Sequence, residues 1–119
     1  MNKYSNTRPN VLLVVTDQQR FDTLGCYGNP DVDTPNLDKF AAEGVLFENG
    51  YCQSPVCTPS RASFLTGRYP RTTRCRANGQ SMPPYERLVS RVLADHGYYC
   101  SLVGKLHLAP CGPTACPIQ

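Results

Sequence analysis

Hydrophobic positions along the chain follow two patterns, continuous apolar runs and helical spacing. Residues 10–16, 45–49 and 98–103 form three runs rich in β-branched and aromatic residues. The continuous apolar character of the first run predicts a strand buried on both faces of a parallel sheet, and the other two runs predict a second and a third strand. Helical spacing predicts one helix that begins at Thr34-Pro35 and stops at Gly44, and another over 85–96 that is capped by Gly97. The alternation of strands and helices predicts an α/β fold, with a mainly parallel sheet flanked by helices.

A shorter helix is predicted to follow Cys57 and to stop at Gly67. Thr58 is a candidate N-cap, and Pro59 has the fixed φ that suits a first helical turn. Cys57 would then lie just outside the helix N-terminus, where backbone N–H groups and the helix dipole favour anions. Arg61, about one turn later, would add a fork of charged donors. The alternative is a buried structural cysteine with a solvated arginine.

Polar side chains follow two of the predicted strands. Asp17 ends the first strand, and Lys105 and His107 follow the third. Binding sites in open α/β sheets form at the carboxyl ends of the strands. Taken singly, the aspartate is explained as a turn or cap residue, and the lysine and histidine as exposed side chains. Together with the helix start at Cys57, they favour a functional site.

Composition excludes several classes of protein. The 119 residues suffice for one modest domain, and the formal net charge of +3 is too weak to argue for nucleic acid. A local basic cluster is interpreted as a solvated loop. It consists of Arg68, Arg71, Arg74 and Arg76. No apolar run approaches the ~20 residues of a membrane span. The polar start does not resemble a signal peptide, so we expect a cytoplasmic location, with a periplasmic or secreted one left open.

The seven cysteines do not predict a disulfide framework. Their number is odd, and the sequence contains no Cys-x-x-Cys pair. His107, Cys111 and Cys116 have neither the spacing nor the second histidine of a standard zinc site. We therefore expect reduced thiols that are mostly buried.

Residues 54–68 resemble the type I sulfatase signature, with a Cys-x-Pro-Ser-Arg core followed by Leu-Thr-Gly-Arg. Further similarity lies in the opening strand, in the next helix and strand, and in the Gly-Tyr and Gly-Lys-x-His elements. These are residues 8–18, 33–38 with 44–47, 97–98 and 104–108. The resemblance implies the N-terminal part of an alkaline-phosphatase-like fold. Residues 1–108 would belong to the catalytic domain, and residues 109–119 would form an irregular tail.

The resemblance also implies the site residues. Cys57 would be oxidised to formylglycine, the catalytic residue, and would be steadied by Arg61. Lys105 and His107 would contact the sulfate or the formylglycine. The metal ligands would be Asp17, Gln18 and the modified Cys57, around a divalent cation that is calcium in most members. Gln18 replaces an aspartate that many members have, and its amide oxygen still suits Ca²⁺.

The implied reaction is hydrolysis of a small-molecule or carbohydrate sulfate monoester. A hydrated formylglycine would attack sulfur, and its second hydroxyl would allow the covalent sulfate to leave. Two alternatives stay open: a phosphonate or phosphate monoester hydrolase of the same superfamily, and a truncated, non-catalytic remnant. Members of the family are several times longer than this chain, and their remaining ligands come later. The isolated chain is therefore expected to be inactive, and the sequence predicts no particular oligomeric state.

Overall fold

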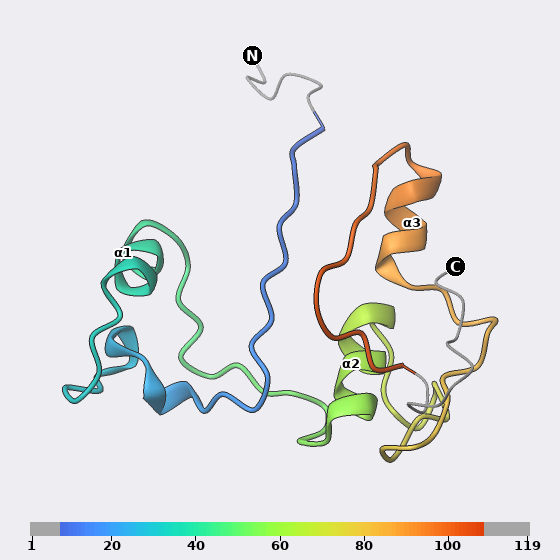
Figure 1. Ribbon diagram of the computed structural model, residues 1–119, viewed down its shortest axis with the longest axis horizontal. Coiled ribbons are helices and arrows are strands. Elements are labelled where there is room, and N and C mark those ends of the chain that lie inside the picture. The colour runs from blue at the N-terminus through green and yellow to red at the C-terminus, as the bar shows by residue number, and fades with distance from the viewer. Residues whose placement is uncertain (1–7, 109–119) are drawn as a thin grey trace. The chain divides into compact units, whose positions relative to one another are not determined.

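The computed structural model describes residues 8–108, which divide after Glu48 into two compact units. In the first unit, an extended segment leads into two short 3₁₀ helices, η1 (Phe21–Thr23) and η2 (Gly25–Tyr27), and then into α1 (Pro35–Glu43) (Figure 1). Helix α1 packs against η2. The sequence patterns predict no helix or strand where these 3₁₀ helices lie.

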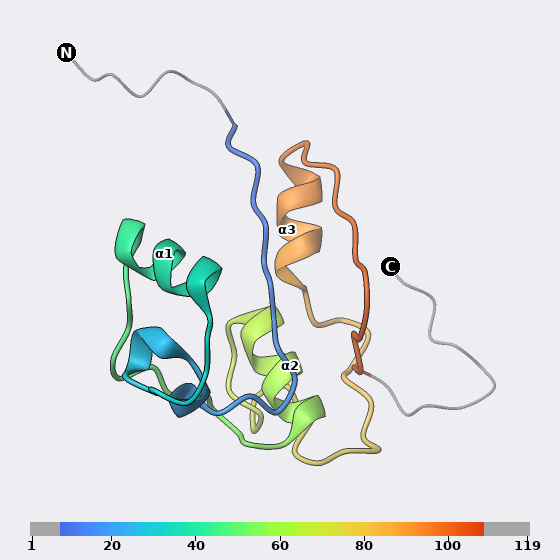
Figure 2. The same cartoon turned by 60° about the vertical axis from the view of Figure 1, so that its left-hand side comes forward.

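The second unit contains the helices α2 (Cys57–Thr66) and α3 (Val89–Asp95), which contact each other (Figure 2). Its core is small. Ala62 of α2 is buried with Cys75 and Leu108, which come from the loop after α2 and from the segment after α3. Partly buried apolar side chains pack around them: Leu65, Met82, Leu88 and Leu106. The core therefore joins α2 to the segment that carries Lys105 and His107.

Helix α1 confirms the prediction from the sequence at both ends. Thr34 occupies the N-cap position before Pro35, and Gly44 follows the last helical residue. The Thr34 hydroxyl does not cap the helix. It accepts a hydrogen bond from the N–H of Gly25 and donates one to Asp38, each at 2.9 Å. Thr34 thus ties the helix to the preceding turn.

Helix α2 begins two residues earlier than predicted. Val56 is the N-cap and Cys57 is the first helical residue, so the prediction that Thr58 caps the helix is wrong. Pro59 is tolerated because the first four N–H groups of a helix have no partner within it. Gly67 ends the helix as predicted, with a left-handed φ of 68°.

Helix α3 is shorter than the predicted span of 85–96. Residues 84–85 form a turn, residues 86–88 are irregular, and Leu88 is the N-cap without a side-chain cap bond. The carboxylate of Glu86 lies beside Arg68 rather than at the helix start. At the other end, the N–H groups of Gly97 and Tyr98 donate to the carbonyls of Ala94 and Leu93. This pairing is a Schellman motif, and Gly97 provides the left-handed residue that it requires.

The three predicted strands are not strands in residues 8–108, where the structure contains helices, turns and extended segments. A strand needs a neighbour to complete its hydrogen bonds. The apolar side chains of residues 11–15 are 45–88% exposed, so no neighbouring strand covers them in the described part of the chain. The α/β class follows from the family reported below, and the parallel sheet remains a prediction.

The five cysteines within the described range are free thiols, but most are not buried. Only Cys75 is fully buried, whereas Cys52 and Cys100 are exposed. The expectation of mostly buried thiols is therefore wrong. Cys111 and Cys116 lie outside the described residues.

Candidate active site

The first turn of α2 is fixed by hydrogen bonds on both sides of Cys57. The Val56 carbonyl accepts the N–H of Ser60 at 3.0 Å, which closes the turn. The N–H of Thr58 donates to the side-chain oxygen of Asn78 at 2.9 Å. One of the unpaired donors of the helix start is thereby satisfied by a residue 20 positions later. Cys57 itself is half-buried and has a free thiol.

Asn78 belongs to a loop with its own internal support. The side-chain oxygen of Gln80 accepts the N–H groups of Arg76 and Ala77 at 2.7 and 3.2 Å. Thr73 and Cys75, which precede Asn78 in the same loop, are fully buried. Burial raises the pKa of the Cys75 thiol. Sequence reasoning missed Asn78, because an Asn-Gly pair in a polar stretch indicates a turn and not a helix cap elsewhere in the chain.

Arg61 joins α2 to the segment after α3. Its side chain lies one turn beyond Cys57, and the residue is only 8% exposed. One guanidinium nitrogen donates to the backbone carbonyl of Lys105 at 2.5 Å. A charge-assisted bond of this kind is about twice as strong as a neutral one. The structure therefore brings together two of the residues that the sequence predicted as a site.

Lys105 and His107 lie on a segment that is anchored in the core. Leu106 packs against the core and Leu108 is part of it. The Leu108 carbonyl accepts the N–H of Met82 at 2.9 Å. His107 is half-buried with a φ of 54°, an unusual backbone conformation for a residue with a side chain. Its Nδ1 is buried and has no hydrogen-bond partner among residues 8–108.

The predicted metal ligands Asp17 and Gln18 belong to the first unit. Both residues are exposed and form a bend after the extended segment. Gln18 has a φ of 56°, which places it in the left-handed region. Their carboxylate and amide oxygens are of the type that Ca²⁺ prefers. Within residues 8–108 no group of three or more His, Cys, Asp or Glu side chains could hold a metal ion.

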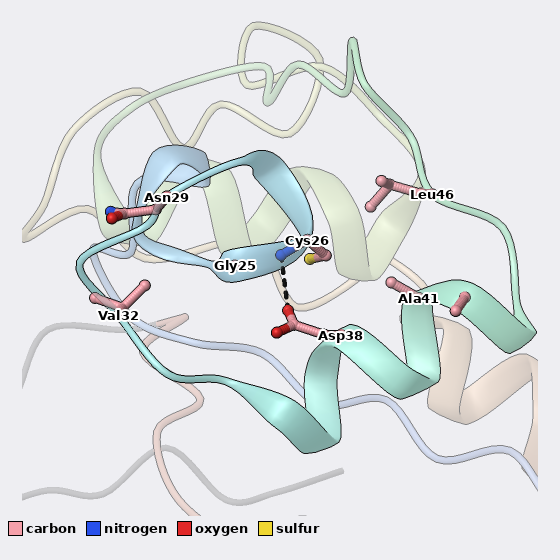
Figure 3. A pocket seen from close by; sticks show the side chains of 8 residues that line it. Gly25, Cys26, Asn29, Val32, Asp38, Ala41 and Leu46 are labelled. Atoms are coloured by element: carbon pink, nitrogen blue, oxygen red, sulfur yellow. Dashed lines mark hydrogen bonds between the residues drawn. The ribbon is translucent and has the colours of Figure 1, made fainter.

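A cavity of about 520 Å³ in the first unit contains none of the predicted site residues. Asp38 of α1 points across it toward η2 (Figure 3). Its carboxylate accepts the N–H of Cys26 at 2.7 Å and the hydroxyl of Thr34 at 2.9 Å. A Cβ atom at Gly25 would lie 2.6 Å from this carboxylate. The carboxylate of Asp38 therefore connects α1 to η2 through hydrogen bonds, and we assign this cavity a structural role.

The comparisons with known proteins identify the family. The sulfatase family model matches residues 9–116, so the chain belongs to the sulfatase family. The chain is 42% identical to mouse steryl-sulfatase over 111 residues, which is 84% of this chain and 18% of that protein. It is 42% identical to human N-acetylgalactosamine-6-sulfatase over 113 residues, 84% of this chain and 22% of that protein.

A bacterial relative is equally similar. The ulvan-active sulfatase of Formosa agariphila is 44% identical over 102 residues, which is 86% of this chain and 20% of that protein. The chain thus spans about a fifth of the length of these relatives. No solved structure is a significant match. None of the helices in residues 8–108 has the length and apolar character needed to cross a membrane.

Proposed function

We propose that this chain carries the nucleophile and part of the anion-binding site of a formylglycine-dependent sulfatase. The observation that carries the proposal is the hydrogen bond from Arg61 to the Lys105 carbonyl. It links the helix that begins at Cys57 to the segment that bears Lys105 and His107. The family match supports hydrolysis of a sulfate ester as the reaction.

The positive groups of this site suit an anionic substrate. The N-terminus of α2 presents backbone N–H groups and the positive end of its dipole. Lys105 is exposed and adds a second positive charge, on the residue whose backbone carbonyl accepts the Arg61 hydrogen bond. These groups stabilise the negative charge that develops on the sulfate oxygens during attack. Conversion of Cys57 to formylglycine would supply a hydrated aldehyde, whose two hydroxyl groups serve attack on sulfur and later release of sulfate.

His107 is the proposed acid and base. Imidazole is the side chain that most often transfers protons in enzymes. Its buried Nδ1 has no partner in the described part of the chain, so a ring nitrogen is available for hydrogen bonding to another group. The left-handed backbone at this position supports a functional role, because such strain persists where the surrounding structure imposes it.

Calcium is the proposed cation, with Asp17 and Gln18 as two of its ligands. Ca²⁺ takes about 6–8 oxygen ligands. Residues 8–108 therefore provide only part of the shell, and Cys57 in its modified form would add an oxygen. The ion would offset negative charge on the sulfate and orient it.

The proposed complete domain has the parallel sheet that the sequence predicts. The exposed apolar residues of the segments 10–16, 45–49 and 98–103 support this proposal, since they form strand sequences that lack partners in residues 8–108. In such a sheet the segments would be interior strands, covered by helices on both faces.

The substrate is proposed to be a sulfate ester of a small molecule or a carbohydrate. The names of the relatives refer to steryl sulfate, to the 6-sulfate of N-acetylgalactosamine and to ulvan. A phosphonate or phosphate monoester hydrolase is the competing function, because its substrates have the same tetrahedral anionic group. The second alternative is that the chain is a truncated remnant without catalytic activity.

A chimera tests the function. Residues 8–108 replace the matching region of the ulvan-active sulfatase, and the protein is produced with a formylglycine-generating enzyme. We expect hydrolysis of an aryl sulfate that is lost in Cys57→Ala, and slower hydrolysis of the matching aryl phosphate and phosphonate. A folded, converted chimera that prefers the phosphorus esters, or that is inactive, would refute the proposal. The isolated chain should show no turnover, because each missing charged contact costs about 10²–10³ in rate.

A further inference from the structure

The charged residues are distributed unevenly between the two units of the chain. Residues 1–48 contain four Lys and Arg and seven Asp and Glu, a formal charge of −3. Residues 49–119 contain eight Lys and Arg and two acidic residues, a formal charge of +6. The two values together give the +3 of the whole chain. The unit that contains Cys57 is therefore strongly basic.

Three arginines of this unit are exposed and have no partner among residues 8–108. The two acidic side chains form ion pairs: Glu86 with Arg68, and Asp95 with Arg87 and Arg91. In contrast, the side chains of Arg71, Arg74 and Arg76 have no ion pair or hydrogen bond with any described residue. We call these three arginines the basic patch. Unpaired cations attract anions more strongly than arginines that are already neutralised.

The basic patch belongs to the loop between α2 and α3, the path of which can be followed in Figure 2. Thr73 and Cys75 alternate with the arginines and are fully buried, which anchors the backbone between them. Arg74 itself has a φ of 58°. Among the described residues other than glycine, only Gln18 and His107 share this left-handed conformation, and both are proposed site residues.

The same loop is attached to the start of α2. Asn78 lies two residues after Arg76 and accepts the N–H of Thr58, the neighbour of Cys57. The backbone N–H of Arg76 also donates a hydrogen bond to the side-chain oxygen of Gln80 at 2.7 Å, which restricts the motion of this loop. The loop that carries the patch therefore contacts the residue next to the proposed nucleophile.

From this arrangement we infer that the substrate is a polyanionic carbohydrate. The basic patch would bind sulfate or carboxylate groups on sugars that neighbour the ester bound at Cys57. Arginine suits such groups, because its planar fork donates two hydrogen bonds to one anion. Three arginines fit a few anionic groups on a short stretch of chain. Duplex DNA is a poorer fit, since a protein that makes about 6–10 phosphate contacts with it needs more cations than the three of the patch. This inference rests on the proposed sulfatase function.

The test is binding of dextran sulfate to the purified 119-residue chain, measured by calorimetry at several salt concentrations. The patch variant is Arg71→Gln/Arg74→Gln/Arg76→Gln. The matched control is Arg20→Gln/Arg87→Gln/Arg91→Gln, which removes the same charge from arginines that pair with Asp22 or Asp95. We expect the patch variant to bind about tenfold more weakly at low salt, with a salt slope reduced by about 2, and the control to bind nearly as the wild type.

Two results would overturn the inference: equal losses in both variants, which would reflect net charge alone, and tighter binding of a DNA duplex than of dextran sulfate. Circular dichroism of both variants shows whether the fold is kept. A patch variant that unfolds is replaced by the single changes Arg74→Gln and Arg76→Gln. The binding assay does not use Cys57, so Cys57→Ala should bind normally. Failure of the sulfatase proposal would therefore appear in the chimera and not in this measurement.

Discussion

The side-chain oxygen of Asn78 accepts the backbone N–H of Thr58 at 2.9 Å, directly after Cys57. The residue that supports the start of α2 thus comes from a loop, and not from the N-cap position, where Val56 offers no side-chain hydrogen bond. The position of Cys57 depends on two segments that are separated by 20 residues. Oxidation of Cys57 and binding of an anion would both occur at this shared boundary.

Removal of this cap should loosen the first turn of α2. In Asn78→Ala the N–H of Thr58 loses its partner, a change that costs about 1–2 kcal/mol at other helix starts. Amide hydrogen exchange measured by NMR should become roughly 5–30-fold faster at Thr58. Asn49→Ala is the control, since Asn49 is exposed, and it should leave the rate unchanged. Equal rates in the two variants would show that the cap has no energetic role.

Arg61 should matter more for stability than an exposed arginine does. Arg61→Ala leaves the Lys105 carbonyl without its charged donor and opens space in the interior, so we expect a loss of about 1.5–3 kcal/mol. Arg91→Ala, which removes a partner of Asp95 on the exposed side of α3, should lose less than about 1 kcal/mol. Urea denaturation provides both free energies of unfolding. A loss at Arg61 no larger than that at Arg91 would contradict the proposed link.

Part of this organisation was predictable from the sequence, and the remainder depended on contacts between distant residues. Local signals located α1 and the end of α2, since proline and glycine act within one turn. The same signals placed the start of α2 two residues late. The support from Asn78 and the pairing of Glu86 with Arg68 depend on tertiary contacts that no local pattern encodes. The three segments predicted as strands are not strands in residues 8–108, and the sheet that they would form stays a prediction.

Cys75 should be the least reactive of the cysteines at 52, 75 and 100. Its thiol is fully buried, and the burial raises its pKa, so a smaller fraction is thiolate at a given pH. Because the folded state holds this proton more tightly, the associated stability is present at neutral pH and declines as pH rises above the ordinary thiol pKa. Iodoacetamide labelling followed by peptide mass spectrometry should modify Cys52 and Cys100 first. Early labelling of Cys75 in the folded chain would contradict its burial.

Calcium should bind weakly to the isolated chain. Asp17 and Gln18 contribute two oxygen ligands of the ~6–8 that the ion takes, so the dissociation constant should be about 10⁻³ M or weaker. Calorimetric titration measures it, and Asp17→Asn should abolish the remaining binding. Asp31→Asn, at another exposed aspartate of the first unit, is the matched control. Micromolar binding would mean that further ligands come from elsewhere in the chain or from a second molecule.

The most direct test of the account is the chemical state of Cys57 after production with a formylglycine-generating enzyme. Trypsin should release residues 40–61 as one peptide, which also contains the exposed Cys52 as an internal control. We predict that fragmentation mass spectrometry will find sulfur replaced by oxygen, with loss of two hydrogens, at Cys57 and not at Cys52. A peptide in which Cys57 remains an unmodified cysteine would contradict the central claim that this residue becomes the nucleophile.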